Sequence, residues 1–279
     1  MKDTANSADS VEGAEAITKG LVEGHTPERP GYWLHTGGTG ILTYFDSVVR
    51  KTFGEPDDKV FNDYDGVSEL LNLPSDAFHR NVDEIVLRTT REHPDVVKAT
   101  IVCPPTIYGK GRGPVSGRGR PVYELAAFIL QEKYCPRIGR GLGRMNNVHI
   151  VDLSQVYELL LEAALDQAQK DNKEIWGAET YFFTENGEHT WGELARQIGE
   201  EAQKLGFIDG PPPELRDYSM EDAEKYAGFE ATSWGMNARC EAVRARKVLG
   251  WKPWERSLVA EIPTIIVSEA ERLELPIKV

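Results

Sequence analysis

The stretch from Lys98 to Pro114, KATIVCPPTIYGKGRGP, restricts the folds open to this chain more than any other. It opens with an apolar run, Ala99 to Cys103, whose β-branched residues are typical of a strand buried on both faces of a parallel sheet. Pro104 and Pro105 end the run, because proline fixes φ and cannot donate a hydrogen bond to a neighbouring strand. In open α/β sheets ligands bind beyond the carboxyl ends of the strands, so we expect the functional site directly after this strand.

The composition narrows the classes of partner. A hydrophobic content of 40% and a charged content of 28% are ordinary for a soluble globular protein. The net charge of −13 argues against nucleic acid or an anionic membrane as partner, and no apolar run approaches the ~20 residues that cross a bilayer. The first residues form no apolar secretory signal. Cysteines 103, 135 and 240 follow neither a metal-binding nor a disulfide pattern, which favours a reducing, cytoplasmic compartment.

Three further segments extend the pattern of the first. They are Tyr32 to Leu42 (YWLHTGGTGIL), Asn147 to Leu153 (NVHIVDL) and Ala245 to Pro253 (ARKVLGWKP). In order and spacing, the four segments together resemble the extended short-chain dehydrogenase/reductase superfamily, which contains the nucleotide-sugar epimerases and dehydratases. The chain is most similar to atypical, catalytically altered fungal NAD(P)-binding members of that superfamily.

The resemblance implies an α/β fold: a partial Rossmann-like parallel sheet, with the C-terminal strands only, and a smaller α+β substrate lobe. It assigns residues 1–115 and about 145–165 to the NAD(P)-binding domain. It assigns residues 116–144 and 166–279 to the substrate lobe. We therefore expect the ligand between these two parts.

The glycine-rich turn that holds a dinucleotide pyrophosphate in such folds has no clear counterpart here. Two glycine clusters, at positions 37, 38, 40 and at positions 109, 111, 113, follow later strands without a clear helix start. We therefore expect an N-terminally truncated family member, through either biology or an incomplete gene model. Because a hydride cannot be moved without a held nicotinamide, such a chain is expected to be inactive alone.

The helix predicted after Ser75 carries Tyr-x-x-x-Lys in active members of the superfamily, where the tyrosine exchanges a proton with the substrate. Here the matching positions read His79-x-x-x-Asp83. Residues at i and i+4 share one helix face, so these two could form a proton relay in which the carboxylate supports the imidazole. The alternative is a surface ion pair on a helix that has lost its catalytic role.

The resemblance also assigns the remaining site residues. Thr36 or Thr39 takes the place of the active-site serine or threonine, unless these residues simply end a strand. The residues placed against the cofactor are Cys103, Pro104, Pro105 and Thr106. The residues placed against the substrate are Tyr108, Asn147 and His149, with a structural role as the alternative for His149.

A loop rich in glycine and arginine follows the key stretch. Arg118 and Arg120 of this loop, Val115 to Arg120, together with Arg112 just before it, could bind phosphate, or the loop could simply be solvated. Pro121 is typical of the first position of a helix, so a helix is predicted to begin there.

Two functions remain open. The first is an NAD(P)-binding, epimerase/dehydratase-like oxidoreductase that uses NAD or NADP and a small-molecule substrate. The second is a non-catalytic, cofactor-sensing or regulatory protein. The loss of Tyr-x-x-x-Lys supports this second function. No metal site is expected, and the family is compatible with a homodimer.

Overall fold

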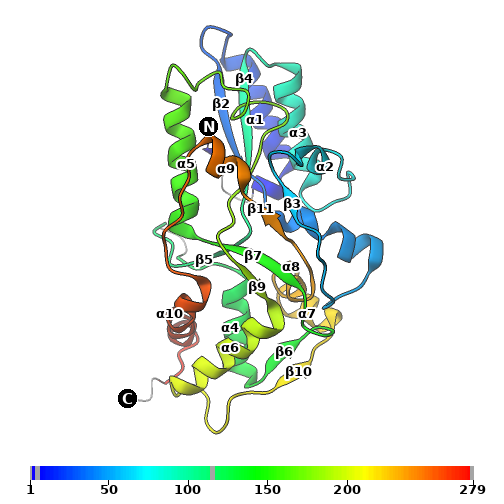
Figure 1. Ribbon diagram of the computed structural model, residues 1–279, viewed down its shortest axis with the longest axis vertical. Coiled ribbons are helices and arrows are strands. Elements are labelled where there is room, and N and C mark those ends of the chain that lie inside the picture. The colour runs from blue at the N-terminus through cyan, green and yellow to red at the C-terminus, as the bar shows by residue number, and fades with distance from the viewer. Residues whose placement is uncertain (1, 4–6, 114–116, 277–279) are drawn as a thin grey trace.

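The computed structural model describes residues 2–3, 7–113 and 117–276 (Figure 1). Its centre is a parallel sheet in the order β1-β2-β4-β8. These strands are Lys2–Asp3, Gly31–Thr36, Val97–Cys103 and Tyr181–Phe183. The apolar run before Pro104 does form a buried strand, β4, as its β-branched residues predict. The predicted α/β fold with a Rossmann-like parallel sheet is confirmed.

Helices cover the sheet on both sides. On one side α1 (Val11–Gly24) packs on α3 (Arg80–Glu92), and on the other lies α5 (Ile150–Leu165) (Figure 1). The hydroxyl of Ser10 caps α1 by accepting a hydrogen bond from the amide of Gly13. Before α1 stands a single 3₁₀ turn, η1 (Ser7–Asp9).

The second lobe is built around β7 (Arg144–His149), which pairs with β5 (Thr106–Tyr108) and β9 (Glu188–Thr190). A two-stranded sheet of β6 (Cys135–Arg137) and β10 (Leu215–Asp217) adjoins it. The helices of this lobe are α4 (Pro121–Glu132), α6 (Trp191–Lys204), α7 (Met220–Ala227), α8 (Phe229–Thr232), η4 (Ser233–Gly235) and α10 (Leu258–Arg272). Helix α4 begins at Pro121, as predicted.

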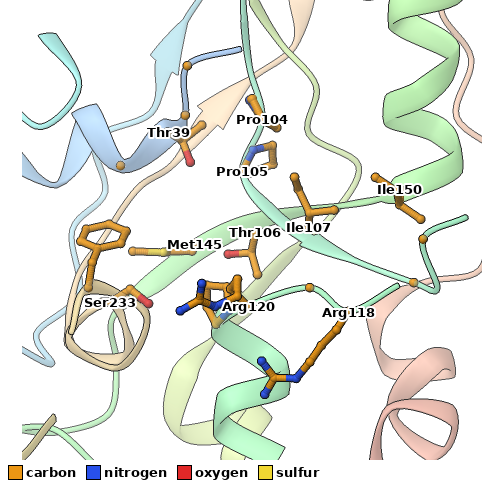
Figure 2. Close-up of a pocket in the computed structure, with 18 of the residues that line it drawn as sticks. Thr39, Pro104, Pro105, Thr106, Ile107, Arg118, Arg120, Met145, Ile150 and Ser233 are labelled. Carbon is orange, nitrogen blue, oxygen red and sulfur yellow. The ribbon is translucent and has the colours of Figure 1, made fainter. Parts of the chain in front are cut away.

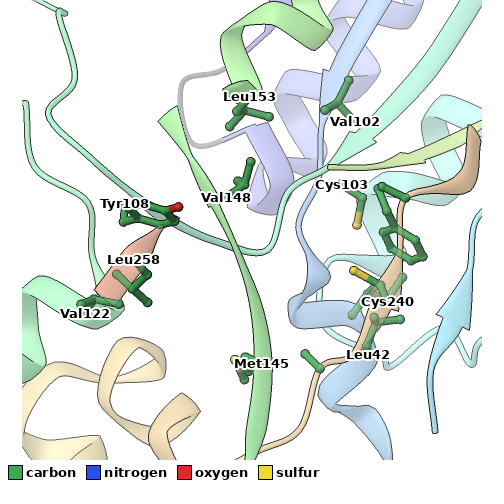
Figure 3. Packing of buried hydrophobic residues seen from close by; sticks show 14 of the residues in the cluster. Leu42, Val102, Cys103, Tyr108, Val122, Met145, Val148, Leu153, Cys240 and Leu258 are labelled. Atoms are coloured by element: carbon green, nitrogen blue, oxygen red, sulfur yellow. The ribbon is translucent and has the colours of Figure 1, made fainter. Parts of the chain in front are cut away.

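Short elements join the two parts. They are η2 (Thr39–Thr43), the π-helix η3 (Phe45–Arg50), β3 (Phe61–Asn62), α2 (Val67–Leu71), β11 (Cys240–Glu241) and α9 (Val243–Val248). Strand β3 pairs with β11, which brings together segments far apart in the chain. The apolar core runs through the junction without a break: Figure 3 shows Cys103 and Cys240 on one side of β7, Val148 on β7 itself, and Leu258 of α10 on the other side.

Two sequence-based expectations need correction. Strand β8 falls within residues 166–279, a range predicted as substrate lobe, yet it pairs with β4 in the main sheet. The helix expected from Ser75 begins only at Arg80. His79 precedes it as the N-cap residue with φ of 68°, which is left-handed backbone.

The side chain of Asp63 lies inside the junction and accepts hydrogen bonds from two separate segments of the chain. Its Oδ2 accepts a hydrogen bond of 2.7 Å from the amide of Phe183 in β8. Its Oδ1 accepts bonds of 3.0 and 2.9 Å from the amides of Val243 and Arg244, at the start of α9. Burial raises the pKa of Asp63 from 3.8 to about 7, against the lowering effect of these amides. A single carboxyl group thus connects the edge strand of the sheet to a helix of the returning chain.

In the described part of the chain, no helix combines the length and apolar character needed to cross a membrane.

Candidate functional site

A cavity of about 400 Å³ opens at the carboxyl ends of β2 and β4, where the sheet meets the second lobe. Figure 2 shows Thr39 and Pro105 on one side of it and Arg118 and Arg120 across from them. Its position agrees with the expectation that ligands of parallel α/β sheets bind beyond the strand ends. The walls are mostly apolar or backbone, and they include Pro104, Pro105, Ile107, Met145, Ile150 and Phe229.

The floor of the cavity is the glycine turn after β2. The amide of Gly37 donates to the carbonyl of Val102 at 2.9 Å, and the amide of Thr39 donates to the carbonyl of Pro104 at 3.0 Å. The turn is therefore pinned to the end of β4 by its own amides. Since these amides are used inside the protein, the turn does not form the cradle of amides that holds a pyrophosphate.

His79 is the only histidine among the described residues that line the cavity. Its side chain is 11% exposed, and its Nδ1 lies 2.8 Å from Oδ1 of Asp9 in η1. The other ring nitrogen, Nε2, faces the glycine turn: a Cβ atom placed on Gly38 would lie only 3.3 Å from it. The ring also packs on Phe78, with centroids 3.8 Å apart.

The predicted pairing of His79 with Asp83 does not occur. His79 stands one helical turn before Asp83, whose amide donates to its carbonyl at 3.1 Å, but His79 has left-handed backbone and its imidazole pairs with Asp9 instead. Asp83 is fully buried under the sheet, where its Oδ2 accepts a hydrogen bond of 2.9 Å from the hydroxyl of Tyr181. Its Oδ1 lies 3.5 Å from Nε2 of His35. Burial, together with the charge of Asp83, raises the pKa of Tyr181.

Several other predicted residues have structural contacts away from the cavity lining. The hydroxyl of Thr36 is hydrogen-bonded to the hydroxyl of Tyr157 in α5. The thiol of Cys103 is buried, and burial raises its pKa well above the ordinary range. The hydroxyl of Tyr108 donates to the carbonyl of Arg256 at 2.8 Å.

His149 and Asn147 are also engaged elsewhere. His149 caps α5, since its Nδ1 accepts a hydrogen bond of 3.2 Å from the amide of Val151. Asn147 lies beside a second cavity of about 310 Å³, with its amide 3.0 Å from Nδ1 of His189. Burial lowers the pKa of His189 to about 3, so this imidazole is neutral at physiological pH.

The cavity thus brings together seven of the candidate residues: Thr39, His79, Pro104, Pro105, Thr106, Arg118 and Arg120. Sequence reasoning did not single out Met145, Ile150, Phe229 or Ser233 as lining residues. Phe229 stacks on Phe78 with ring centroids 4.5 Å apart, which closes one side of the cavity across the junction. These residues come from two segments, 145–150 and 229–233, which lie far from β2 and β4 in the sequence.

Arg118 and Arg120, on the side of the cavity across from Thr39 and Pro105, each pair with carboxylate groups. Arg118 donates from Nε and Nη2 to the buried Glu269 at 2.7 and 3.0 Å, and from Nη1 to Glu124 at 2.6 Å. These carboxylates raise the pKa of Arg118 despite its partial burial, which opposes them. Arg120 lies 3.0 Å from Glu230, and its side chain is 61% exposed. A role in holding phosphate would therefore require Arg120 to exchange Glu230 for the ligand.

The residues present fit part of a nicotinamide dinucleotide. Pro104 and Pro105 offer a flat apolar surface beside the glycine turn, and Gly38 and Gly40 carry no side chains that would fill the space next to it. The fit therefore concerns the ring end of such a molecule.

Comparison with known proteins identifies a relative of this chain. No family model matches it. It is 40% identical over 264 residues to the oxidase ucsJ of Acremonium sp, an alignment that covers 93% of this chain and 75% of that protein. The comparison lends no support to the predicted truncation and inactivity.

Solved structures share the fold. The dTDP-glucose 4,6-dehydratase DesIV of Streptomyces venezuelae, with NAD and TYD bound, has a TM-score of 0.56 at 14% identity, covering 98% of this chain and 71% of its own. The UDP-glucose 4-epimerase of Thermotoga maritima, with UDP-glucose, has a TM-score of 0.56 at 14% identity, covering 94% and 69%. The protein therefore belongs to the family of the Acremonium oxidase ucsJ, and its fold is that of the NAD-dependent epimerases and dehydratases.

Proposed function

We propose that this protein is an NAD(P)-binding oxidoreductase of the epimerase/dehydratase-like type that acts on a small molecule in the cavity between sheet and lobe. The observation that carries the proposal is the cavity itself. It lies at the carboxyl ends of β2 and β4 and receives Nε2 of His79. Kinship with a protein named as an oxidase supports redox chemistry, and the NAD held by the dehydratase neighbour supports the cofactor.

The cofactor would supply hydride transfer, and the chain's own residues would position it. Pro104 and Pro105 would support the nicotinamide ring, since a flat apolar surface favours stacking of a planar ring. Thr39 would offer its hydroxyl at the edge of the same surface.

The substrate is proposed to be largely apolar. Ile107, Met145, Ile150 and Phe229 form much of the wall opposite the glycine turn. Burial of apolar ligand surface against such side chains is favourable by about 25 cal/mol per Å². The epimerase neighbour holds UDP-glucose, a strongly polar ligand that would leave many of its hydroxyl groups against apolar walls here.

A specific observation favours a second candidate, a protein that binds the cofactor without turnover. Among the described residues, the cavity lining contains neither tyrosine nor lysine. These are the groups that the resemblance gives to proton transfer. Under this alternative the cavity would retain the ligand while His79 served only to shape it.

Isothermal titration calorimetry with NADH and NADPH tests the proposal. Ile107→Trp would fill the cavity and weaken binding by at least about 10-fold, which equals 1.4 kcal/mol. Leu165→Trp adds the same ring at a position of α5 that is 82% exposed, so it serves as the matched control. Absence of binding to the wild-type chain, or equal binding by both variants, would contradict the proposal. Turnover of a panel of apolar secondary alcohols and ketones, followed by absorbance of the reduced nicotinamide, then distinguishes enzyme from sensor.

A further inference from the structure

We propose that Asp9 and His79 form a carboxylate–imidazole pair that serves as the acid–base group of the cavity. In this pair His79 exchanges a proton with a hydroxyl or carbonyl oxygen of a ligand seated against Gly38 and Thr39. Asp9 is a positioning residue that acts through the imidazole. The inference rests on the proposed function for the presence of a ligand, but its geometry stands on this chain alone.

Two segments 70 residues apart build the pair. Asp9 ends η1, which packs against both α3 and β2, and His79 stands at the N-terminus of α3. The carboxylate oxygen lies 2.8 Å from Nδ1, within hydrogen-bonding distance. The Asp9 side chain is 47% exposed and approaches from the solvent side, whereas the imidazole is 11% exposed.

The contact fixes which ring nitrogen carries the proton. An ionised carboxylate only accepts hydrogen bonds, so Nδ1 must donate. In the neutral ring Nε2 then keeps a lone pair, and this is the nitrogen that faces Gly38 in the cavity. A group with this orientation can remove a proton from a ligand hydroxyl, or return one to a carbonyl oxygen after protonation.

Two further features restrict the orientation of the imidazole. The backbone of His79 adopts φ of 68°, a conformation that residues other than glycine seldom take. Such outliers are common at functional sites. Phe78 packs on one face of the ring, and Phe78 in turn stacks on Phe229 across the junction. The orientation of Nε2 is therefore set before a ligand arrives, which is the condition for efficient proton transfer.

The other charged groups of the lining do not compete for this role. Arg118 and Arg120 are both paired with carboxylates, and a guanidinium group has no acceptor atom that could take a proton from the ligand. The proposed step balances simply: the O–H bond of the ligand breaks as the N–H bond at Nε2 forms. The positive charge that appears on the ring is balanced by the carboxylate of Asp9.

Long-range ¹H–¹⁵N NMR of the imidazole side chains tests the pair without any ligand. The signals of His79 are assigned by comparison with His79→Asn. In the wild-type chain His79 is expected in the Nδ1–H tautomer when neutral. Asp9→Ala is expected to shift it toward the Nε2–H form that free histidine prefers, and Asp9→Glu to restore the Nδ1–H form in part. Glu12→Ala removes an exposed acid from the same region and should leave the spectrum unchanged.

An Nε2–H tautomer in the wild-type chain, or an Nδ1–H tautomer that persists in Asp9→Ala, would overturn the proposal. Where the alcohol panel yields a substrate, His79→Asn should lower kcat by about 100-fold, while binding of NADH measured by calorimetry stays within about twofold. Unchanged kcat in that variant would also overturn it. Because the NMR readout needs no cofactor, loss of the proposed function and loss of the pair are separate outcomes: a chain that binds no NADH can still show the tautomer.

Discussion

Replacing Asp63 by asparagine probes the carboxyl group that connects β8 to the start of α9. The substitution keeps the size of the side chain but replaces one acceptor oxygen by an NH₂ group. Two of the three amide bonds can be kept on the remaining oxygen, those from Val243 and Arg244. The amide of Phe183 would then face a donor instead of an acceptor. A buried donor left without a partner costs about 2 kcal/mol, so the variant is expected to lose that much unfolding free energy at pH 5.

The loss should depend on pH because the pKa of Asp63 is raised to about 7 in the folded chain, from an ordinary value of 3.8. Between these values the unfolded chain has released the proton and the folded chain has kept it. The unfolded state therefore binds fewer protons, and the wild-type unfolding free energy falls as pH rises. The stabilising contribution is fully present below the unfolded pKa and is lost as pH rises through the folded pKa. From pH 5 to pH 7 this one group accounts for a fall of about 2 kcal/mol.

Asparagine does not titrate, so the variant lacks this part of the pH dependence. The expected gap of about 2 kcal/mol at pH 5 should therefore close nearly to zero at pH 7. Urea unfolding followed by tryptophan fluorescence at the two pH values measures the gap. Asp65→Asn, the same change at an exposed position nearby, controls for the general effect of charge. A gap of equal size at both pH values would refute the reasoning, because it would mean that the carboxyl group ionises alike in both states.

Three further outcomes follow from the geometry. Lys133→Gly should raise the unfolding free energy by about 1 kcal/mol, since Lys133 ends α4 with φ of 60°; unchanged urea midpoints would contradict it. Glu269→Ala should lower the unfolding free energy by about 3 kcal/mol, because it removes the buried partner of Arg118, and a loss below about 1 kcal/mol would show that Glu124 suffices as partner. Gly109→Ala should lower the thermal midpoint, since φ is 88° and the new Cβ would lie 2.2 Å from Nε2 of His149; an unchanged midpoint would mean that this imidazole can move aside.

The features that could be predicted from the sequence are local ones. The strand before Pro104 and the helix from Pro121 are marked by neighbouring residues, because proline ends a strand and begins a helix by its own geometry. The pairing of β8 with β4 could not be read in the same way, since an aromatic triplet fits either part of the fold. Only its partner, about 80 residues earlier in the chain, decides where it lies.

The site shows the same division. The resemblance located the cavity through Thr39, Pro104 and the residues between the strands, because strand ends of a parallel sheet lie together. It misjudged the partner of His79. The assumption of an unbroken helix makes Asp83 the natural neighbour, whereas the left-handed backbone at His79 turns the imidazole toward Asp9. A spacing rule cannot reveal a contact that spans 70 residues.

The path of the chain between the two parts of the fold, visible in Figure 1, affects how the protein unfolds and how it responds to proteolysis. After β4 the chain enters the second lobe, and α5 leads it back to the main sheet, to which it contributes β8. It then enters the second lobe again at α6 and returns to the junction at β11. Neither half is a contiguous piece of sequence, so a nick in any one connection leaves both halves still tied by the others. We infer that the protein melts as one cooperative unit and that limited proteolysis releases no autonomous fragment.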